Sequence, residues 1–231
     1  MNAPCALVIA PHPDDEVLGA GGTIARLAGD GWRVVVVVVC SDLPPTYPAG
    51  IAEEVEAEAR EAHALLGVAV SEFLHLPSVE LSRGAVTTLN GPLQALVEEH
   101  RPTLALIPFP DRHVDHRTVF DASMVVTRPV GAGRDLRTVA MYETVSETFW
   151  NAPGAEPTFT PSWHVDITET VRTKIDAFRC FASQLQPDPG PRSVRALESL
   201  AGFRGSQVGL SSAESFQVVR SVSPVGPVMG G

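Results

Sequence analysis

The sequence predicts an α/β fold in which helices cover both faces of a mostly parallel sheet. Along residues 5–142, short apolar runs alternate with longer segments of helical period. The run at 33–40 contains six consecutive valines, which indicates a strand buried on both faces. This alternation favours right-handed crossovers and a doubly wound, Rossmann-like sheet with the strand order 3-2-1-4-5.

Each predicted element follows from its local pattern. Strands are expected where apolar and β-branched residues run together, at residues 5–10, 33–40, 72–76, 103–108 and 138–142. Helices are expected where apolar residues recur at helical spacing, at residues 17–28, 51–66, 92–100, 114–126, 168–183 and 195–203. Glycines end the first two helices, at Gly29 and Gly67, and Thr168 is the expected N-cap of the fifth helix.

We expect one domain over residues 1–231, because α/β folds of this length are commonly undivided. Residues 1–142 form the predicted α/β core. Residues 143–163 are rich in proline, threonine and aromatic residues, and predict a long loop before the C-terminal helices. A loop is expected at 186–192 and a frayed end at 225–231.

Composition excludes several classes of protein. The chain carries 17 basic and 27 acidic residues, a net charge of −10, and no basic stripe, so nucleic acid is not an expected partner. The imbalance lies in residues 1–100, which hold 4 arginines and 14 acids. Hydrophobic residues make up 44% of the chain, which argues against disorder.

The cysteines and the apolar runs predict a cytoplasmic protein. Cys5, Cys40 and Cys180 are odd in number and far apart, as is typical of reduced thiols in an intracellular protein. The N-terminal residues lack the basic and apolar regions of a signal peptide. The longest purely apolar run, at 34–40, is too short to span a bilayer.

A first cluster of polar residues, Pro11 to Glu16, follows the first predicted strand. It places His12 and the carboxylates of Asp14, Asp15 and Glu16 within five residues. These residue types supply metal ligands and a spare proton acceptor, as metal-assisted hydrolysis requires. Taken alone, the cluster is equally compatible with a turn followed by a helix start, where proline and acidic residues are common.

A second cluster, Asp111 to His116, follows the strand predicted at 103–108. Its His-x-x-His spacing alone is weak and more typical of a solvated loop. In a 3-2-1-4-5 sheet, however, the first and fourth strands are neighbours at the switch point, where ligands bind beyond the strand ends. The two clusters are therefore expected to face each other and to form a metal site.

The chemistry of these residues assigns each a role. A catalytic zinc has three protein ligands and one open position, and His12, Asp15 and His116 supply such a set. Asp14 is then free to act as the general base on a metal-activated water, and His113 can stabilise an oxyanion or protonate the leaving group. Asp115 is expected to orient an imidazole. The same ligands suit Fe²⁺, Co²⁺ or Mn²⁺.

Together these residues resemble the PIG-L/LmbE superfamily of zinc-dependent de-N-acetylases. The resemblance is strong over residues 5–125 and looser beyond. It rests on the matching motifs Pro11-His12-Pro13-Asp14-Asp15-Glu16, Gly21-Gly22-Thr23 and His113-Val114-Asp115-His116, with support from Leu66-Gly67-Val68, Leu76-Pro77, Lys174, Ser183-Gln184 and 213–216. It implies an LmbE-like fold, zinc bound by His12, Asp15 and His116, Asp14 as base, and His113, partnered by Asp115, at the oxyanion.

The resemblance fails at one position. Members often carry an arginine twelve residues before the glycine of Leu66-Gly67-Val68, and this chain has Val55 there. Arg60 is a candidate substitute for contacting substrate. Tyr142 and Trp150 are further candidates. The aromatic residues of 144–163, which include Trp150, are expected either to cover the site as a lid or to fill a small separate core.

The expected function is hydrolysis of an N-acetyl group from an N-acetylglucosamine-type glycoside or glycoconjugate. An amidase acting on a larger acyl amide, such as a thiol conjugate, is an alternative, as is a non-catalytic sugar-binding homologue. A metal phosphoesterase is disfavoured because no basic residue adjoins the first cluster. The expected partners are a small glycoside substrate and, as in many family members, further copies of the chain.

Overall fold

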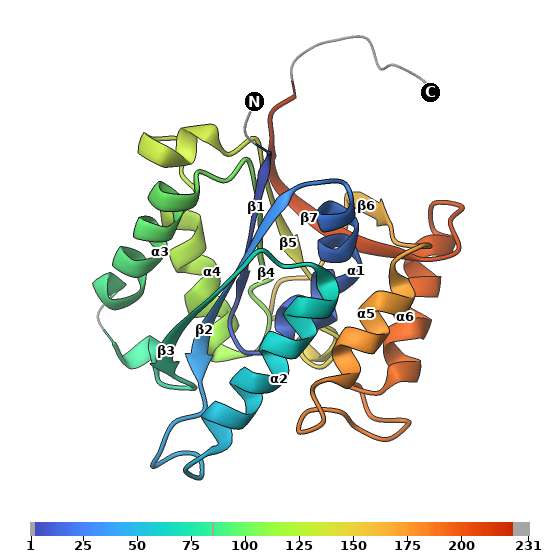
Figure 1. Ribbon diagram of the computed structural model, residues 1–231, viewed down its shortest axis with the longest axis horizontal. Helices are drawn as coiled ribbons and strands as arrows, with labels where there is room; N and C mark the ends of the chain where they lie inside the picture. Colours follow the sequence, from blue (N-terminus) through green and yellow to red (C-terminus); the bar gives the residue numbers. More distant parts are fainter. Residues whose placement is uncertain (1–2, 85, 224–231) are drawn as a thin grey trace.

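A seven-stranded sheet forms the centre of the structure, a computed structural model that describes residues 3–84 and 86–223 (Figure 1). The end expected to fray, at 225–231, lies outside the described residues. The strand order is β3-β2-β1-β4-β5-β7-β6. The parallel part contains β1 (Cys5–Ala10), β2 (Arg33–Ser41), β3 (Val70–Pro77), β4 (Leu104–Pro108) and β5 (Thr138–Tyr142). The predicted order 3-2-1-4-5 is therefore confirmed.

Helices cover both faces of the sheet (Figure 1). One face packs against α1 (Asp15–Gly29), α2 (Ile51–Leu66) and α5 (Val171–Arg179), and α6 (Val194–Ser206) packs beside α5 and β7. The other face packs against α3 (Val86–His100) and α4 (Val114–Val126). Short 3-10 turns lie at η1 (Leu81–Arg83), η2 (Gly131–Asp135) and η3 (Thr148–Trp150). None of the described helices is long and apolar enough to cross a membrane.

Two antiparallel strands were not predicted. β7 (Ala213–Ser221) pairs with β5 and with β6 (Trp163–Asp166), and extends the sheet at one edge. The β6 side chains are half-buried, and the second half of β7, at 217–221, mixes two valines with polar residues and is half-buried to exposed. Such segments lack the continuous apolar run that marks the central parallel strands, which explains why the sequence pattern missed them.

Four helices differ from their predicted bounds, and for α6 the difference is an extension from 195–203 to Val194–Ser206. Helix α1 begins at Asp15, so the carboxylates of the first cluster belong to its first turn. Helix α3 begins at Val86 and contains Pro92, because Leu89, Leu93 and Leu96 give it one continuous buried stripe. Helix α5 is confined to Val171–Arg179, and its N-cap is Thr170 rather than Thr168.

Helix α1 is fixed in place by a buried ion pair from the C-terminal part of the chain. The Glu214 carboxylate on β7 accepts hydrogen bonds from the backbone amides of Gly22 and Thr23, at 2.9 and 2.7 Å. Lys174 on α5 donates to the same carboxylate at 2.6 Å and to the Leu18 carbonyl at 2.8 Å. Every charge in this group therefore has a partner, and α1 is tied to both α5 and β7.

Close packing also sets the position of α1. A side chain at Gly19 would collide with the ring of Tyr142, and one at Gly22 would lie 2.8 Å from Ile167. Tyr142 is itself fully buried, and its hydroxyl donates to the Ile9 carbonyl at 2.8 Å. Tyr142 is thus a core residue that supports β1 and α1, which corrects the expectation that it contacts substrate.

Candidate metal centre and substrate cavity

The turn between β1 and α1 holds the first cluster in a strained conformation. Asp14 is the N-cap of α1 and has a φ of 112°, in the left-handed region that residues other than glycine seldom adopt. The Asp15 carboxylate accepts the backbone amide of His12 at 3.0 Å and so closes the turn. Strain of this kind costs of order 1–3 kcal/mol and is concentrated at functional sites.

The structure brings the two clusters together at the ends of β1 and β4. One oxygen of Asp15, Oδ2, lies 3.1 Å from Nδ1 of His12 and 3.2 Å from Nε2 of His116. The ring of His113 lies beside them, with its centroid 4.6 Å from that of His12. Ring nitrogens of all three histidines lie within 4.8 Å of one another.

The residues present fit a divalent metal. Ligand atoms on a tetrahedral zinc, each bonded at about 2.0–2.1 Å, are separated by roughly 3.3 Å, close to the spacing of Asp15 from His12 and His116. The second oxygen of Asp15, Oδ1, is buried and has no hydrogen-bond partner among the described residues. Imidazole and carboxylate are the ligand types that catalytic zinc sites use.

Two further carboxylates orient the histidines from behind. Asp115 accepts the backbone amide of Val79 at 2.7 Å and contacts Nε2 of His12 at 3.0 Å. The imidazole that the Asp115 carboxylate orients is therefore that of His12, whereas the resemblance implied His113. Asp111 contacts Nδ1 of His116 at 3.0 Å. Sequence reasoning placed Asp111 in the second cluster but gave it no role. Its position five residues before His116 was the available clue.

Asp14 is buried but lacks hydrogen bonds. Its side chain is 1% exposed, and neither carboxylate oxygen has a hydrogen-bond partner among the described residues. Nη1 of Arg192 lies 3.3 Å from Oδ2 as an ion pair without hydrogen-bond geometry. Burial, and then the charges of Asp15 and Glu16, raise the pKa of Asp14 to about 8, while Arg192 opposes the shift. A carboxylate in this position is a strong proton acceptor.

His113 is held as a neutral imidazole. It is the N-cap of α4, and its Nδ1 accepts the backbone amide of Asp115 at 3.2 Å. Burial, followed by the positive charges of His12 and His116, lowers the pKa of His113 to about 4. Because Nδ1 is the acceptor, the ring proton resides on Nε2, which becomes a hydrogen-bond donor.

The side chains of Asp14 and of the three histidines line one cavity of about 410 Å³, called the site cavity here. Its wall combines both clusters with residues of α2 and of three loops, and comprises His12, Pro13, Asp14, Asp42, Tyr47, Pro48, Ile51, Val55, His113, His116, Glu147, Gln184 and Arg192. Val55 thus lies in the wall at the position where many family members carry an arginine. Arg192, which no local sequence pattern marked, supplies a guanidinium from another part of the chain.

The other predicted substrate residues lie outside this wall. Arg60 is on the outer face of α2, where it pairs with Glu56 at 2.7 Å and lies over the ring of Phe73. Trp150, in η3, is 52% exposed and does not line the site cavity. The structure therefore does not bring Arg60 or Trp150 to the site cavity, because α2 and η3 direct them elsewhere.

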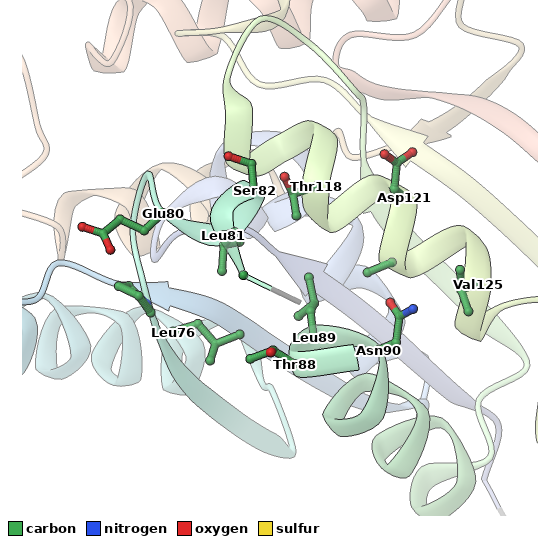
Figure 2. Close-up of a pocket in the computed structure, with 13 residues that line it drawn as sticks. Leu76, Glu80, Leu81, Ser82, Thr88, Leu89, Asn90, Thr118, Asp121 and Val125 are labelled. Atoms are coloured by element: carbon green, nitrogen blue, oxygen red, sulfur yellow. The ribbon is translucent and has the colours of Figure 1, made fainter. Parts of the chain in front are cut away.

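A second cavity, of about 370 Å³, lies between β3, η1, α3 and α4 (Figure 2). Its wall is mostly apolar and includes Leu76, Leu81 and Leu89, with Thr118 and Asp121 contributed by α4. No residue predicted to bind metal or substrate lines this cavity. Although it is the more apolar of the two, the ionisable groups of the two clusters lie in the site cavity instead.

Comparison with known proteins gives the family. Residues 7–127, just over half of the chain, match the PIG-L family, described as GlcNAc-PI de-N-acetylase. The protein therefore belongs to the PIG-L family. Its similarity to characterised proteins extends well beyond the matched residues.

Three relatives show how far the similarity extends. Diacetylchitobiose deacetylase of Thermococcus kodakarensis is 26% identical, over 94% of this chain and 83% of that protein. The crystal structure of the conserved protein TT1542 from Thermus thermophilus superposes with a TM-score of 0.77 at 26% identity, over 98% of this chain and 99% of that one. N,N'-diacetylchitobiose deacetylase from Pyrococcus horikoshii superposes with a TM-score of 0.74 at 25% identity, over 94% and 84%.

Proposed function

We propose that this protein is a zinc-dependent hydrolase that removes the N-acetyl group from an N-acetylglucosamine-type glycoside or glycoconjugate. The observation that carries the proposal is the site cavity, where Asp14 lies beside the ligand set of His12, Asp15 and His116. The family description and the diacetylchitobiose deacetylase among the relatives support an N-acetyl sugar as the substrate.

His12, Asp15 and His116 would hold the metal, with Asp115 and Asp111 orienting the two imidazoles. When bound, zinc would polarise the amide carbonyl and make a water molecule more acidic. Fe²⁺, Co²⁺ or Mn²⁺ would suit the same ligands. The charge of the histidine–carboxylate set and its burial favour a dication over a monovalent ion.

The chain's own residues supply the proton transfers. Asp14 would take the proton of the attacking water and later deliver it to the departing amine, since a base near neutral pKa performs both steps efficiently. His113 would donate its Nε2 proton as a hydrogen bond to the oxygen that becomes negative in the tetrahedral intermediate. Both groups line the same cavity, as one substrate amide would require.

The test is acetate release by the zinc-loaded protein from N-acetylglucosamine and diacetylchitobiose. We expect one acetate and one free amine per turnover, loss of activity with a chelator, and recovery on adding zinc. N-butanoylglucosamine separates the alternative of a larger acyl group. Faster release of butanoate than of acetate would favour the broader amidase, and stoichiometric zinc without release from any of these sugars would contradict the proposal.

The ligand assignment has its own test. His116→Ala should lose stoichiometric zinc, because it removes one of three protein ligands. His113→Ala should retain zinc and lower kcat. The three histidines lie close enough that His113 could replace a ligand, so zinc content of the two purified variants is the measurement. If His113→Ala loses zinc and His116→Ala retains it, then His113 is the metal ligand and His116 is the oxyanion donor.

A further inference from the structure

One cation enters the site cavity from a part of the chain far from both clusters. Arg192 lies in the segment between α5 and α6, and this segment is folded back on itself. The Gln186 amide donates to the Arg192 carbonyl at 3.0 Å, and the Gln186 side chain accepts the Arg192 amide at 3.3 Å. The backbone of Arg192 is thus fixed before its side chain reaches the cavity.

Three polar partners hold the guanidinium of Arg192. Nε donates to the hydroxyl of Ser146 at 3.1 Å, and Nη1 donates to the side chain of Gln184 at 2.8 Å. Nη1 also lies 3.3 Å from the Asp14 carboxylate. These contacts fix the plane of a group whose donors form a rigid fork. Among the described residues, Nη2 has no partner, and Arg192 lines the site cavity.

The residues in the wall of the site cavity determine which kind of ligand can bind next to Arg192. Asp14, Asp42 and Glu147 contribute three carboxylates to the wall that holds this one guanidinium, while α2 contributes only Ile51 and Val55. A phosphate or carboxylate ligand would face those acids, whereas a neutral hydroxyl can accept from Nη2 and donate to a carboxylate. The wall therefore favours an uncharged, hydroxyl-bearing sugar over an anionic one.

We propose that Arg192 is a substrate-binding residue whose Nη2 donates to a sugar oxygen adjacent to the N-acetyl group. The inference rests on the proposed function. Its basis is the distance of 3.3 Å between Nη1 and Asp14, which puts the guanidinium beside the base proposed to serve the scissile amide, with Nη2 as its remaining donor. In N-acetylglucosamine the nearest such oxygens are those on carbons 1 and 3.

The experiment compares Arg192→Met with the wild type on N-acetylglucosamine and on its 1-, 3-, 4- and 6-deoxy analogues. A hydrogen bond to a charged donor is worth enough that kcat/KM on the parent sugar should fall roughly 10–100-fold. On the 1-deoxy or the 3-deoxy analogue the loss should be clearly smaller, because the oxygen that Arg192 contacts is missing and only the effect of the lost Asp14 ion pair remains. The 4- and 6-deoxy analogues should show the full loss.

Two further variants complete the experiment. Arg192→Lys keeps the charge with a different donor geometry and should recover part of the loss on the parent sugar. Arg195→Gln is the matched control, since Arg195 is exposed and pairs with Asp188 near the same segment. Arg195→Gln should leave kcat/KM unchanged on every sugar. The same fold-loss for Arg192→Met on all five sugars, or no loss on any, would overturn the inference. A wild type that releases no acetate would instead contradict the proposed function and remove the basis of this inference.

Discussion

Two buried groups of charges lie on either side of helix α1, and they are satisfied to different degrees. Around Lys174 and Glu214, each carboxylate oxygen accepts from an amide or from the ammonium group. At the start of the same helix, both oxygens of Asp14 and one of Asp15 are buried without a hydrogen-bond partner among the described residues. Asp14 is also strained, at a φ of 112°.

This difference distinguishes a group of charges that stabilises the fold from one that serves the site. A paired and fully hydrogen-bonded charge holds elements together, and its removal should lower the free energy of unfolding. A buried carboxylate without hydrogen-bond donors costs stability in the folded state, even where a cation lies near it, and is retained where a ligand or a reaction uses it. The unsatisfied carboxylate oxygens of Asp14 and Asp15 therefore belong to the site, and the satisfied pair joins α1, α5 and β7.

The largest expected effect is the loss of turnover in Asp14→Asn. Removing a general base costs typically 10²–10⁴-fold in kcat. The melting temperature should stay the same or rise, because asparagine tolerates the left-handed conformation and carries no buried charge. Measurement of kcat, zinc content and thermal unfolding tests this. Asp30→Asn, at the exposed far end of α1, is the control. An unchanged rate would remove Asp14 from the role of base.

Lys174→Met should show the opposite pattern. It leaves the Glu214 carboxylate buried without its cation, and breaking a buried pair in this way costs about 3–5 kcal/mol. Urea unfolding should therefore shift to a lower midpoint, while zinc content and turnover of the folded fraction stay near the wild type. Arg172→Gln, which removes an exposed pair on the same helix, should leave the midpoint almost unchanged. A urea midpoint of Lys174→Met equal to that of the wild type would show that the Lys174–Glu214 pair does not stabilise the fold.

The variant Asp111→Asn combines features of Asp14→Asn and Lys174→Met. Its carboxylate belongs to the site, yet it has partners in His113, His116 and Thr148. Replacing a carboxylate that orients a metal-binding histidine typically costs 10–100-fold in metal affinity or activity. Zinc titration of the variant should show a loss in that range, with little change in stability. A loss as complete as that of His116→Ala would make Asp111 a ligand.

The smallest expected effect is a dependence of metal affinity on pH. Burial by itself lowers the pKa of His116. The charge of Asp15 and the hydrogen bond to Asp111 outweigh burial and raise this pKa to about 9. A protonated imidazole cannot coordinate, so metal binding must displace that proton below this pKa. Affinity should rise about tenfold per pH unit, up to the pKa, for each proton displaced. Calorimetry in buffers of different ionisation enthalpy measures the proton release, and a pH-independent affinity would contradict it.

The parallel core could be predicted from the sequence because its signals are local. The six valines of β2 and the strand–helix alternation gave the order 3-2-1-4-5, and this order placed the two clusters at neighbouring strand ends. His12 and His116 both lie within about a hydrogen-bond distance of Asp15. β6 and β7 escaped prediction because their half-exposed residues acquire their pattern only by pairing with each other and with β5.

Residues that act across long separations could not be predicted in the same way. Arg192 sits in a proline-rich loop, and nothing in its neighbours indicates that it reaches Asp14. Arg60 was a reasonable substitute by sequence proximity to Val55, but the turn of α2 directs it toward Glu56. The family resemblance assigned Asp115 to His113, two residues before it, whereas its carboxylate reaches the ring of His12 across the site.

The hydrogen bonds from Gly22 and Thr23 to Glu214 join residues that are 192 and 191 positions apart. Amide hydrogen exchange at these two positions therefore reports whether the last strand has docked, as well as whether the helix has formed. During synthesis, α1 leaves the ribosome long before β7, so these two hydrogen bonds form only after Glu214 has been made. The contacts that tie α1 to β7 are thus completed only once β7 has been synthesised, although the turn that carries Asp14 is closed by local hydrogen bonds.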